Sequence, residues 1–316
     1  MIHFLLIVVG FVFLTGGANL LVNGASGMAA KMKIPPLVVG LTVVAFGTSA
    51  PELLVNVVAA IKGSSQIAIT NVLGSNSINT FVILGVSALF YPLVAQKSTV
   101  RAEIPLSLFA ALSVLVLGTV KFVGKANELS LLDGVFLLVC FAGFIGYTVG
   151  LAGKGELPVP EETKPTTIGK AVFLVVGGLV ALGLGAEVVV RSAVRMAAQW
   201  GVSESVIGVT IVALGTSLPE LATSVVAAIK KEADIAVGNI IGSNIFNVFF
   251  VLGLSAVIRP LPAYPNLIAD ASVAALGSLM VLLFVGLGKK RTLNRRHGIV
   301  LLLIYAVYLA WIIYTL

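Results

Sequence analysis

The chain has 316 residues, of which 59% are hydrophobic and only 10% are charged, and its formal net charge is +7. A mean hydropathy of +1.11 excludes an ordinary soluble domain, in which about a quarter of the residues are charged. We expect the basic excess to reflect membrane topology and anionic lipid as a partner, so it does not indicate a nucleic-acid partner.

Ten apolar stretches follow one another along the chain, each long enough to span a bilayer. The predicted spans are 2–30, 36–61, 65–90, 102–120, 129–151, 168–199, 205–229, 234–258, 267–287 and 298–316. We therefore predict an all-α membrane protein with five spans in each half. The first half covers 1–151, the inter-repeat loop 152–167 and the second half 168–316.

The two halves share a repeated segment. Residues 36–87 align with 204–255 at a constant offset of 168, and 28 of the 52 positions are identical. Halves with an odd number of spans enter the membrane in opposite orientations. The sequence therefore predicts an inverted repeat of two five-helix halves, in which matching residues meet near the middle of the membrane.

The positions of lysine and arginine predict the orientation of the ten spans. If the N-terminus is outside, fourteen of these residues lie on the inner side and six on the outer side. Inner loops of membrane proteins are enriched in positive charge. We expect an integral protein of a prokaryotic plasma membrane with both termini outside.

The repeat places one glutamate within each second span. Residues 42–53 read TVVAFGTSAPEL and contain Glu52, and residues 210–221 read TIVALGTSLPEL and contain Glu220. An ionisable residue inside a membrane span is costly and by default marks an ion or substrate pathway. The prolines before them, Pro51 and Pro219, predict that both helices are broken at Gly-Thr-Ser-x-Pro-Glu, where freed backbone can line a cavity.

Other oxygen-bearing side chains recur beside the two glutamates. Thr48 and Ser49 precede Glu52 on one helix face, and the third span adds Ser75 and Asn79 at i, i+4. This inventory of hard oxygen suits Ca²⁺ or Na⁺ and argues against zinc or copper. Two carboxylates neutralise one Ca²⁺, so two protons or several Na⁺ ions could replace it.

Three other interpretations compete with ion exchange. Small and hydroxylated residues also pack transmembrane helices against each other, although that role does not explain a duplicated mid-span glutamate. A passive cation channel needs a continuous pore. An intramembrane enzyme needs a nucleophile–base pair, which is missing beside the glutamates. We interpret the other acids as interfacial: Glu103, Glu128, Asp133, Glu187 and Asp270.

The motifs GTSAPE (47–52) with NVLGSNSIN (71–79), and GTSLPE (215–220) with NIIGSNIFN (239–247), resemble the two α-repeats of the Ca²⁺/cation antiporter superfamily, whose prokaryotic members include sodium/calcium and proton/calcium exchangers. The resemblance covers essentially the whole chain. It implies a secondary transporter, not an enzyme, with no cofactor and with first and sixth spans that slide as a gate. The ion ligands that it implies are Thr48, Ser49, Glu52, Ser75, Asn79, Thr216, Ser217, Glu220, Ser243 and Asn247, with the backbone carbonyls of Ala45 and Ala213.

Two features of this chain bear on the coupling ion. Sodium-coupled members of the superfamily commonly have an aspartate where this chain has Asn79 or Asn247. The resulting count of two acids favours exchange of one Ca²⁺ against two protons. Proton-coupled members, however, more often carry a GNA-type motif where this chain has GTS. We predict a Ca²⁺ antiporter driven by H⁺, with a Na⁺/Ca²⁺ exchanger as the alternative.

Overall fold

The structure is a computed structural model that describes residues 2–120, 127–153, 167–288 and 290–315. The predicted inter-repeat loop 152–167 lies mostly outside the described residues, as do Lys121, Lys125, Lys154, Lys164 and Lys289, which entered the charge count.

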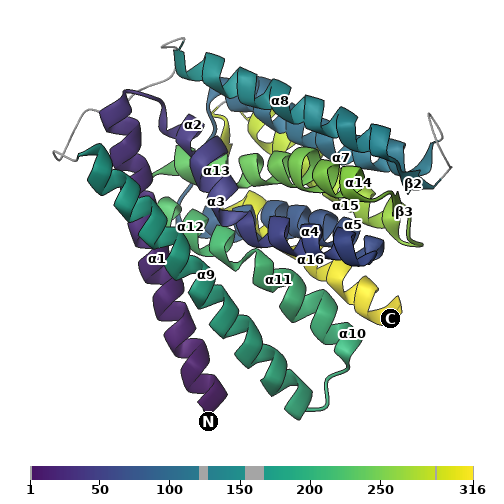
Figure 1. The fold of residues 1–316 in the computed structure, drawn as a ribbon. Helices are drawn as coiled ribbons and strands as arrows, with labels where there is room; N and C mark the ends of the chain where they lie inside the picture. The colour runs from purple at the N-terminus through teal and green to yellow at the C-terminus, as the bar shows by residue number, and fades with distance from the viewer. Residues whose placement is uncertain (1, 121–126, 154–166, 289, 316) are drawn as a thin grey trace.

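The described chain is a bundle of helices of very different lengths (Figure 1). Its α-helices are α1 (Ile2–Met32), α2 (Pro36–Val39), α3 (Ala45–Thr48), α4 (Ala50–Lys62), α5 (Ser65–Ser77), α6 (Leu84–Phe90), α7 (Ile104–Thr119), α8 (Leu131–Gly153), α9 (Ile168–Gln199), α10 (Glu204–Ile207), α11 (Ala213–Thr216), α12 (Leu218–Ile229), α13 (Ala233–Phe246), α14 (Gly253–Ile258), α15 (Leu267–Gly286) and α16 (Arg295–Thr315). Five π-helical turns interrupt them: η1 (Gly40–Val44), η2 (Ile78–Ile83), η3 (Thr99–Glu103), η4 (Gly208–Val212) and η5 (Asn247–Leu252). The strands are β1 (Leu93–Val94), β2 (Glu128–Leu129), β3 (Leu261–Pro262) and β4 (Thr292–Leu293).

Eight helices in the described ranges are long and apolar enough to cross a membrane, and the number rises to ten if each of two bent pairs counts as one span. The predicted boundaries agree closely with the helices. The span predicted at 168–199 is α9, and the span predicted at 102–120 is the continuous helix Thr99–Thr119. Long apolar runs therefore located the helices within a few residues.

The two bent pairs contain the repeated glutamate motif. Pro36–Thr48 and Ala50–Lys62 meet at 48°, and Thr210–Thr216 and Leu218–Ile229 meet at 59°. Each proline lies in the first turn of the helix after the bend, where its missing N–H costs no hydrogen bond. The prolines thus start new helices, and the bends fall at Ser49 and Ser217.

The two longest helices, α1 and α9, lie side by side and cross the remaining bundle steeply (Figure 1). Glycines bring their backbones together. A Cβ at Gly17 would lie 2.8 Å from the carbonyl oxygen of Gly178, and a Cβ at Gly10 would lie 3.0 Å from that of Gly185. The offset of 168 converts Gly10 to Gly178 and Gly17 to Gly185, so the two contacts are equivalent.

The short strands pair in the same reciprocal way. β1 pairs antiparallel with β4, with Leu93 opposite Leu293, and β2 pairs antiparallel with β3, with Glu128 opposite Pro262. β1 and β3 are related by the offset of 168. Each half therefore contributes one strand to each pair, which joins the halves at two places.

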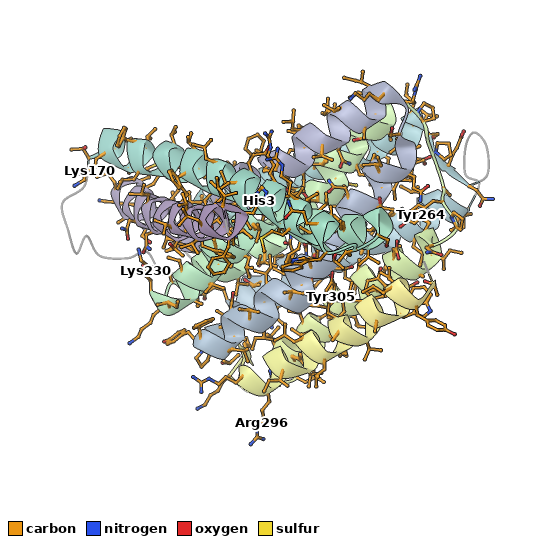
Figure 2. The ribbon with its side chains drawn as sticks, turned by 90° about the horizontal axis from the view of Figure 1, so that it is seen from below. His3, Lys170, Lys230, Tyr264, Arg296 and Tyr305 are labelled. Carbon is orange, nitrogen blue, oxygen red and sulfur yellow. The ribbon has the colours of Figure 1, made fainter. Side chains whose placement is uncertain are left out.

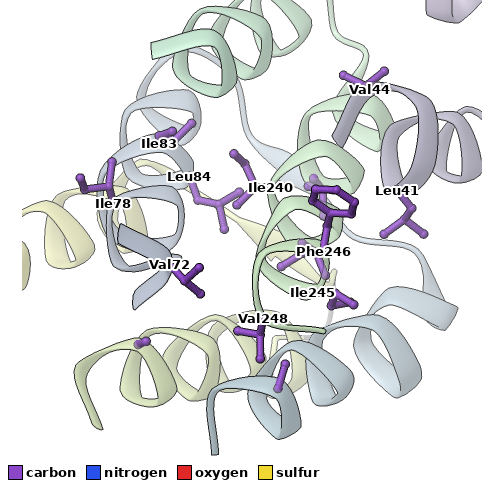
Figure 3. Close-up of a cluster of buried hydrophobic side chains, with 14 of the residues drawn as sticks. Leu41, Val44, Val72, Ile78, Ile83, Leu84, Ile240, Ile245, Phe246 and Val248 are labelled. Carbon is purple, nitrogen blue, oxygen red and sulfur yellow. The ribbon is translucent and has the colours of Figure 1, made fainter. Parts of the chain in front are cut away.

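The apolar core lies between the central spans α5–η2–α6 and α13–η5–α14. Figure 3 shows Val72, Leu84, Ile240 and Val248 gathered there, and all four are buried. Most lysine and arginine side chains lie at the edge of the molecule instead. Figure 2 shows Lys170 and Arg296 projecting from the ends of their helices. The polar site described next is therefore enclosed by apolar packing.

Candidate ion-binding site

The two repeated glutamates face each other's half of the chain. Ser49 Oγ donates a hydrogen bond to Glu220 Oε1 over 2.8 Å, and Ser217 Oγ donates to Glu52 Oε1 over 3.5 Å. All four side chains are fully buried, at 0% exposure. Both glutamates lie in the first turn of a helix, where the helix dipole favours negative charge. The bends at Ser49 and Ser217 thus bring one carboxylate from each half into a single site.

Hydroxyl groups surround the carboxylates on both sides. Ser75 Oγ donates to Glu52 Oε1 over 3.3 Å and lies 3.5 Å from Thr216 Oγ1. Ser243 Oγ donates to the Ala45 carbonyl over 3.4 Å. Thr48 Oγ1 donates to Asn239 Oδ1 over 3.0 Å. The third span of each half therefore lies against the bent second span of the other half.

Asn79 and Asn247 are held by Asn244 and Asn76, which were not among the predicted ligands. Asn79 Nδ2 donates to Asn244 Oδ1, and Asn247 Nδ2 donates to Asn76 Oδ1, each over 3.1 Å. Asn76 Nδ2 in turn donates to the Asn244 carbonyl over 3.0 Å. The signal was present in the sequence, because Asn76 and Asn244 belong to the repeated motif that contains Asn79 and Asn247.

Asn71 and Asn239, at equivalent positions of the two repeats, join the helices around the site. Asn71 Nδ2 donates to Asn56 Oδ1 over 2.7 Å, and at the equivalent positions Asn239 Nδ2 donates to Ser224 Oγ over 3.0 Å. Each bond joins the second and third spans within one half. These residues fix the helices that carry the glutamates, although they were not among the predicted ligands.

Four buried oxygen atoms at this centre accept no hydrogen bond within the described residues: Oε2 of Glu52 and Glu220, and Oδ1 of Asn79 and Asn247. An unpartnered buried carboxylate oxygen is costly, and a cation coordinated by these atoms would remove that cost. Carboxylate and amide oxygens are ligands for Ca²⁺ and other hard cations. No third Asp, Glu, His or Cys joins the two glutamates in the described ranges.

An apolar cavity of about 830 Å³ adjoins one side of the site, where it reaches Gly47 and Thr48. Its other walls are mainly apolar, with Phe46, Phe141 and Leu179 among them. Such walls offer no oxygen to replace the hydration of an ion. The cavity therefore has the character of a lipid-facing recess.

The remaining acids, which were interpreted as interfacial, differ in their burial. Glu187 is exposed and pairs with Arg191 four residues later on α9. Glu103 is fully buried and accepts a hydrogen bond from Tyr147. Asp133 is also buried, where it caps α8 with Ser130. Position near the end of a span did not predict these burials, because neighbouring helices cover the span ends.

Comparison with known proteins agrees with the resemblance seen in the sequence. A family model described as "Sodium/calcium exchanger protein" matches residues 2–150 and 170–314. The sodium/calcium exchanger MaX1 of Methanosarcina acetivorans is 32% identical over 348 residues and covers 99% of both chains. The inner membrane protein YrbG of Escherichia coli is 38% identical over 264 residues, which cover 81% of this chain and 79% of YrbG.

Solved structures agree with the sequence matches. A structure of the sodium-calcium exchanger NCX_Mj, soaked with Na⁺ and Ca²⁺, superimposes with a TM-score of 0.84 at 30% sequence identity. The superposition covers 98% of each chain.

Proposed function

Because the chain belongs to the sodium/calcium exchanger family, we propose that it exchanges Ca²⁺ for another cation across the membrane at the site of Glu52 and Glu220. The observation that carries this proposal is the set of four unpartnered, buried oxygen atoms at the centre of the protein. Two carboxylates from opposite halves balance the charge of one Ca²⁺. The transported ion then supplies the partner that these oxygens lack.

The proposed ligand set contains every position implied by the resemblance. It consists of the side chains of Thr48, Ser49, Glu52, Ser75, Asn79, Thr216, Ser217, Glu220, Ser243 and Asn247 and the backbone carbonyls of Ala45 and Ala213. Hydrogen bonds among Ser49, Glu52, Ser217 and Glu220 support the inclusion of both halves. Asn76 and Asn244 are proposed as positioning residues that orient the amide oxygens of Asn79 and Asn247.

The architecture proposed for this site is an inverted repeat of two five-helix halves, 1–151 and 168–316, joined by the loop 152–167. Reciprocal contacts support it. The offset of 168 residues converts the hydrogen bond between Asn79 and Asn244 into the one between Asn247 and Asn76. It relates the glycine contacts of α1 with α9 in the same way. A two-fold axis in the membrane plane produces contacts of this kind.

The proposed mechanism is alternating access, in which α1 and α9 slide as a gate over the remaining bundle. The glycine contacts support this assignment, because they hold the backbones of α1 and α9 close together as one unit that can move over the bundle. A passive channel is the alternative mechanism. The architecture disfavours it, because a bundle with two bent helices around a central closed site is typical of transporters. The proposed orientation in the membrane has both termini outside, and the distribution of lysine and arginine supports it.

Two observations favour different coupling ions. The site has two acids and neutral asparagines at 79 and 247, which favours two protons against one Ca²⁺. The names of MaX1 and NCX_Mj, both similar to this chain over nearly its whole length, favour Na⁺. The proton remains our prediction from the residues of this chain, with Na⁺ as the second candidate.

The test is Ca²⁺ uptake into proteoliposomes under two separate gradients. The first experiment imposes a pH gradient without Na⁺, and the second imposes a Na⁺ gradient at matched pH. Uptake that requires either gradient supports antiport and identifies the coupling ion. Uptake that proceeds equally without any opposing gradient would contradict antiport and favour a channel.

A further inference from the structure

A second buried carboxylate with a spare oxygen lies outside the glutamate pair. Glu103 ends the π-helical turn η3 and is fully buried, and its Oε1 accepts a hydrogen bond from Tyr147 of α8. Its Oε2 is buried and forms no hydrogen bond with any described residue, and the same is true of the hydroxyl oxygens of Ser98 and Thr99. Thr99 lies four and Ser98 five residues before Glu103 on this helical turn, a spacing that puts their side chains on the same side of the turn as the carboxylate. We call Ser98, Thr99, Glu103 and Tyr147 the η3 oxygen cluster.

The π-helical turn that forms this cluster has no equivalent at the matching position of the second half, residues 267–271, which the structure describes as α-helix. η1 and η4 occupy equivalent positions before the glutamate motifs, and η2 and η5 follow the Ser-Asn motifs. η3 stands apart, because the equivalent helix α15 begins as ordinary α-helix at Leu267. π-Helical turns are rare and occur frequently at functional sites. The four paired turns flank the proposed ion site, so the fifth turn, η3, is a candidate for a second functional site.

The second half carries an acid one residue away from the corresponding place, since the position equivalent to Glu103 is itself Ala271. Asp270, near the start of α15, accepts from Tyr308 at Oδ1 over 2.7 Å and from Tyr264 at Oδ2. Both of its oxygens therefore have a tyrosine partner. At the position equivalent to Tyr264 the first half has Gln96, whose amide instead donates to both oxygens of Asp234, over 3.1 and 2.9 Å. Glu103 thus has one tyrosine and one open oxygen.

We propose that the η3 oxygen cluster binds a single monovalent cation, with Na⁺ as the ion that fits its oxygen chemistry. Glu103 supplies one negative charge, which one monovalent cation balances, and Ser98 and Thr99 supply neutral hydroxyl oxygens. Tyr147 holds the other carboxylate oxygen in place. The neighbouring cations Lys97 and Arg101 are exposed to solvent, so they do not occupy the buried side of the turn.

The site is distinct from the transport site and does not depend on the proposed exchange. Its residues lie on η3, on the residue before it and on α8, whereas the transport site lies on the bent second spans and on the third spans. A cation bound there would hold η3 and α8 together in the first half, as Tyr264 and Tyr308 hold α15 and α16 in the second. We expect it to stabilise the protein without being transported.

The experiment measures thermal unfolding of the purified full-length protein in detergent. The Glu52→Gln/Glu220→Gln background removes both carboxylates of the transport site. Its unfolding temperature is recorded in NaCl and in choline chloride at equal ionic strength. We expect NaCl to raise it, the added substitution Glu103→Gln to abolish that rise, and the matched substitution Asp270→Asn to preserve it.

A second, milder variant keeps the proposal testable if Glu103→Gln does not fold. Thr99→Val keeps the Glu103–Tyr147 hydrogen bond and removes one proposed ligand. It should raise the NaCl concentration needed for half of the stabilisation by about tenfold, which is typical for loss of one supporting group in an ion site. The proposal is overturned if the background shows no Na⁺-specific stabilisation, or if Glu103→Gln or Thr99→Val leaves it unchanged.

Discussion

The central spans, α5–α6 and α13–α14, and the outer pair of helices, α1 and α9, are packed in different ways. In the central spans α5–α6 and α13–α14, 78% and 83% of the residues in the most apolar stretch are buried, against 33% in each of α1 and α9. Asparagines link the central spans to each other, as in the bonds of Asn76 and Asn244. Glycines bring α1 and α9 into backbone contact, as at Gly17 and Gly178.

The two regions therefore differ in how their helices are held: side-chain hydrogen bonds link the polar centre, and backbone contacts at glycines join α1 and α9. Buried side-chain hydrogen bonds are directional, so moving one partner leaves the other unsatisfied. Glycine contacts between helices let two backbones approach closely, so α1 and α9 can move together as one unit. We therefore expect substitutions in the centre to change ion binding and substitutions at the glycine contacts of the outer pair to change the rate of exchange.

The largest effect is expected at the two glutamates. Glu52→Gln and Glu220→Gln should each abolish Ca²⁺ exchange, because an amide replaces a charge-assisted ligand and leaves Ca²⁺ half-compensated in a buried site. The measurement is Ca²⁺ uptake into proteoliposomes. Glu187→Gln, at an exposed glutamate of α9, is the matched control and should exchange normally. Near-normal exchange by either glutamate variant would contradict the assignment of the ion site to Glu52 and Glu220.

A smaller loss is expected when the central asparagine links are broken. Asn244→Ala removes the acceptor for Asn79, and Asn76→Ala removes the acceptor for Asn247. Either change should weaken Ca²⁺ affinity about 10- to 100-fold, as loss of groups that orient metal ligands commonly does. Binding is measured by calorimetry on the detergent-solubilised protein. Thr70→Ala serves as control, since its hydroxyl bonds to its own helix at Gln66; equal losses in both would contradict a positioning role.

The outer pair is tested by filling one glycine contact. Gly17→Ala places a methyl group 2.8 Å from the Gly178 carbonyl and should force α1 and α9 apart, at a cost of about 1–3 kcal/mol. We expect slower exchange with nearly unchanged Ca²⁺ affinity. Gly16→Ala is the matched control, because nothing lies within 4 Å of its added methyl group. A fall in affinity instead of rate would contradict the division between centre and outer pair.

The smallest effect is a change of affinity with pH. Both glutamates must be ionised to hold Ca²⁺, so apparent affinity should fall as pH decreases and protons occupy the carboxylates. Affinity is followed from mildly alkaline to mildly acidic conditions at constant Na⁺. A flat profile over that range would show that neither carboxylate takes up a proton in competition with Ca²⁺.

Asn247→Asp sharpens this pH test. A third acid at the centre should hold a proton more tightly than two acids do, so the pH dependence of Ca²⁺ uptake should shift toward alkaline conditions. The matched change Thr223→Ser, at a buried hydroxyl of α12 outside the proposed ligand set, should leave the profile in place. An unshifted profile in the aspartate variant would place position 247 outside the ion site.

Local sequence was sufficient for the order of the helices and for the family. Long apolar runs placed α9 at 168–199, and the bends fall within the Gly-Thr-Ser-x-Pro-Glu motifs, because hydropathy and proline act over a few residues. The family predicted from these motifs is confirmed by the match to sodium/calcium exchangers. The ligand set and the coupling ion stay predictions.

The tertiary structure alone decided which groups meet. Ser49 bonds to the glutamate of the opposite half, 171 positions away, and not to Glu52 three residues later. Asn76 and Asn244 orient the predicted amides, and Glu103 is buried by helices that cover the end of its span. Partners so far apart in the chain are selected by the crossing of helices from both halves. Hydropathy records only whether a residue prefers water or apolar surroundings, so it carries no information about that crossing.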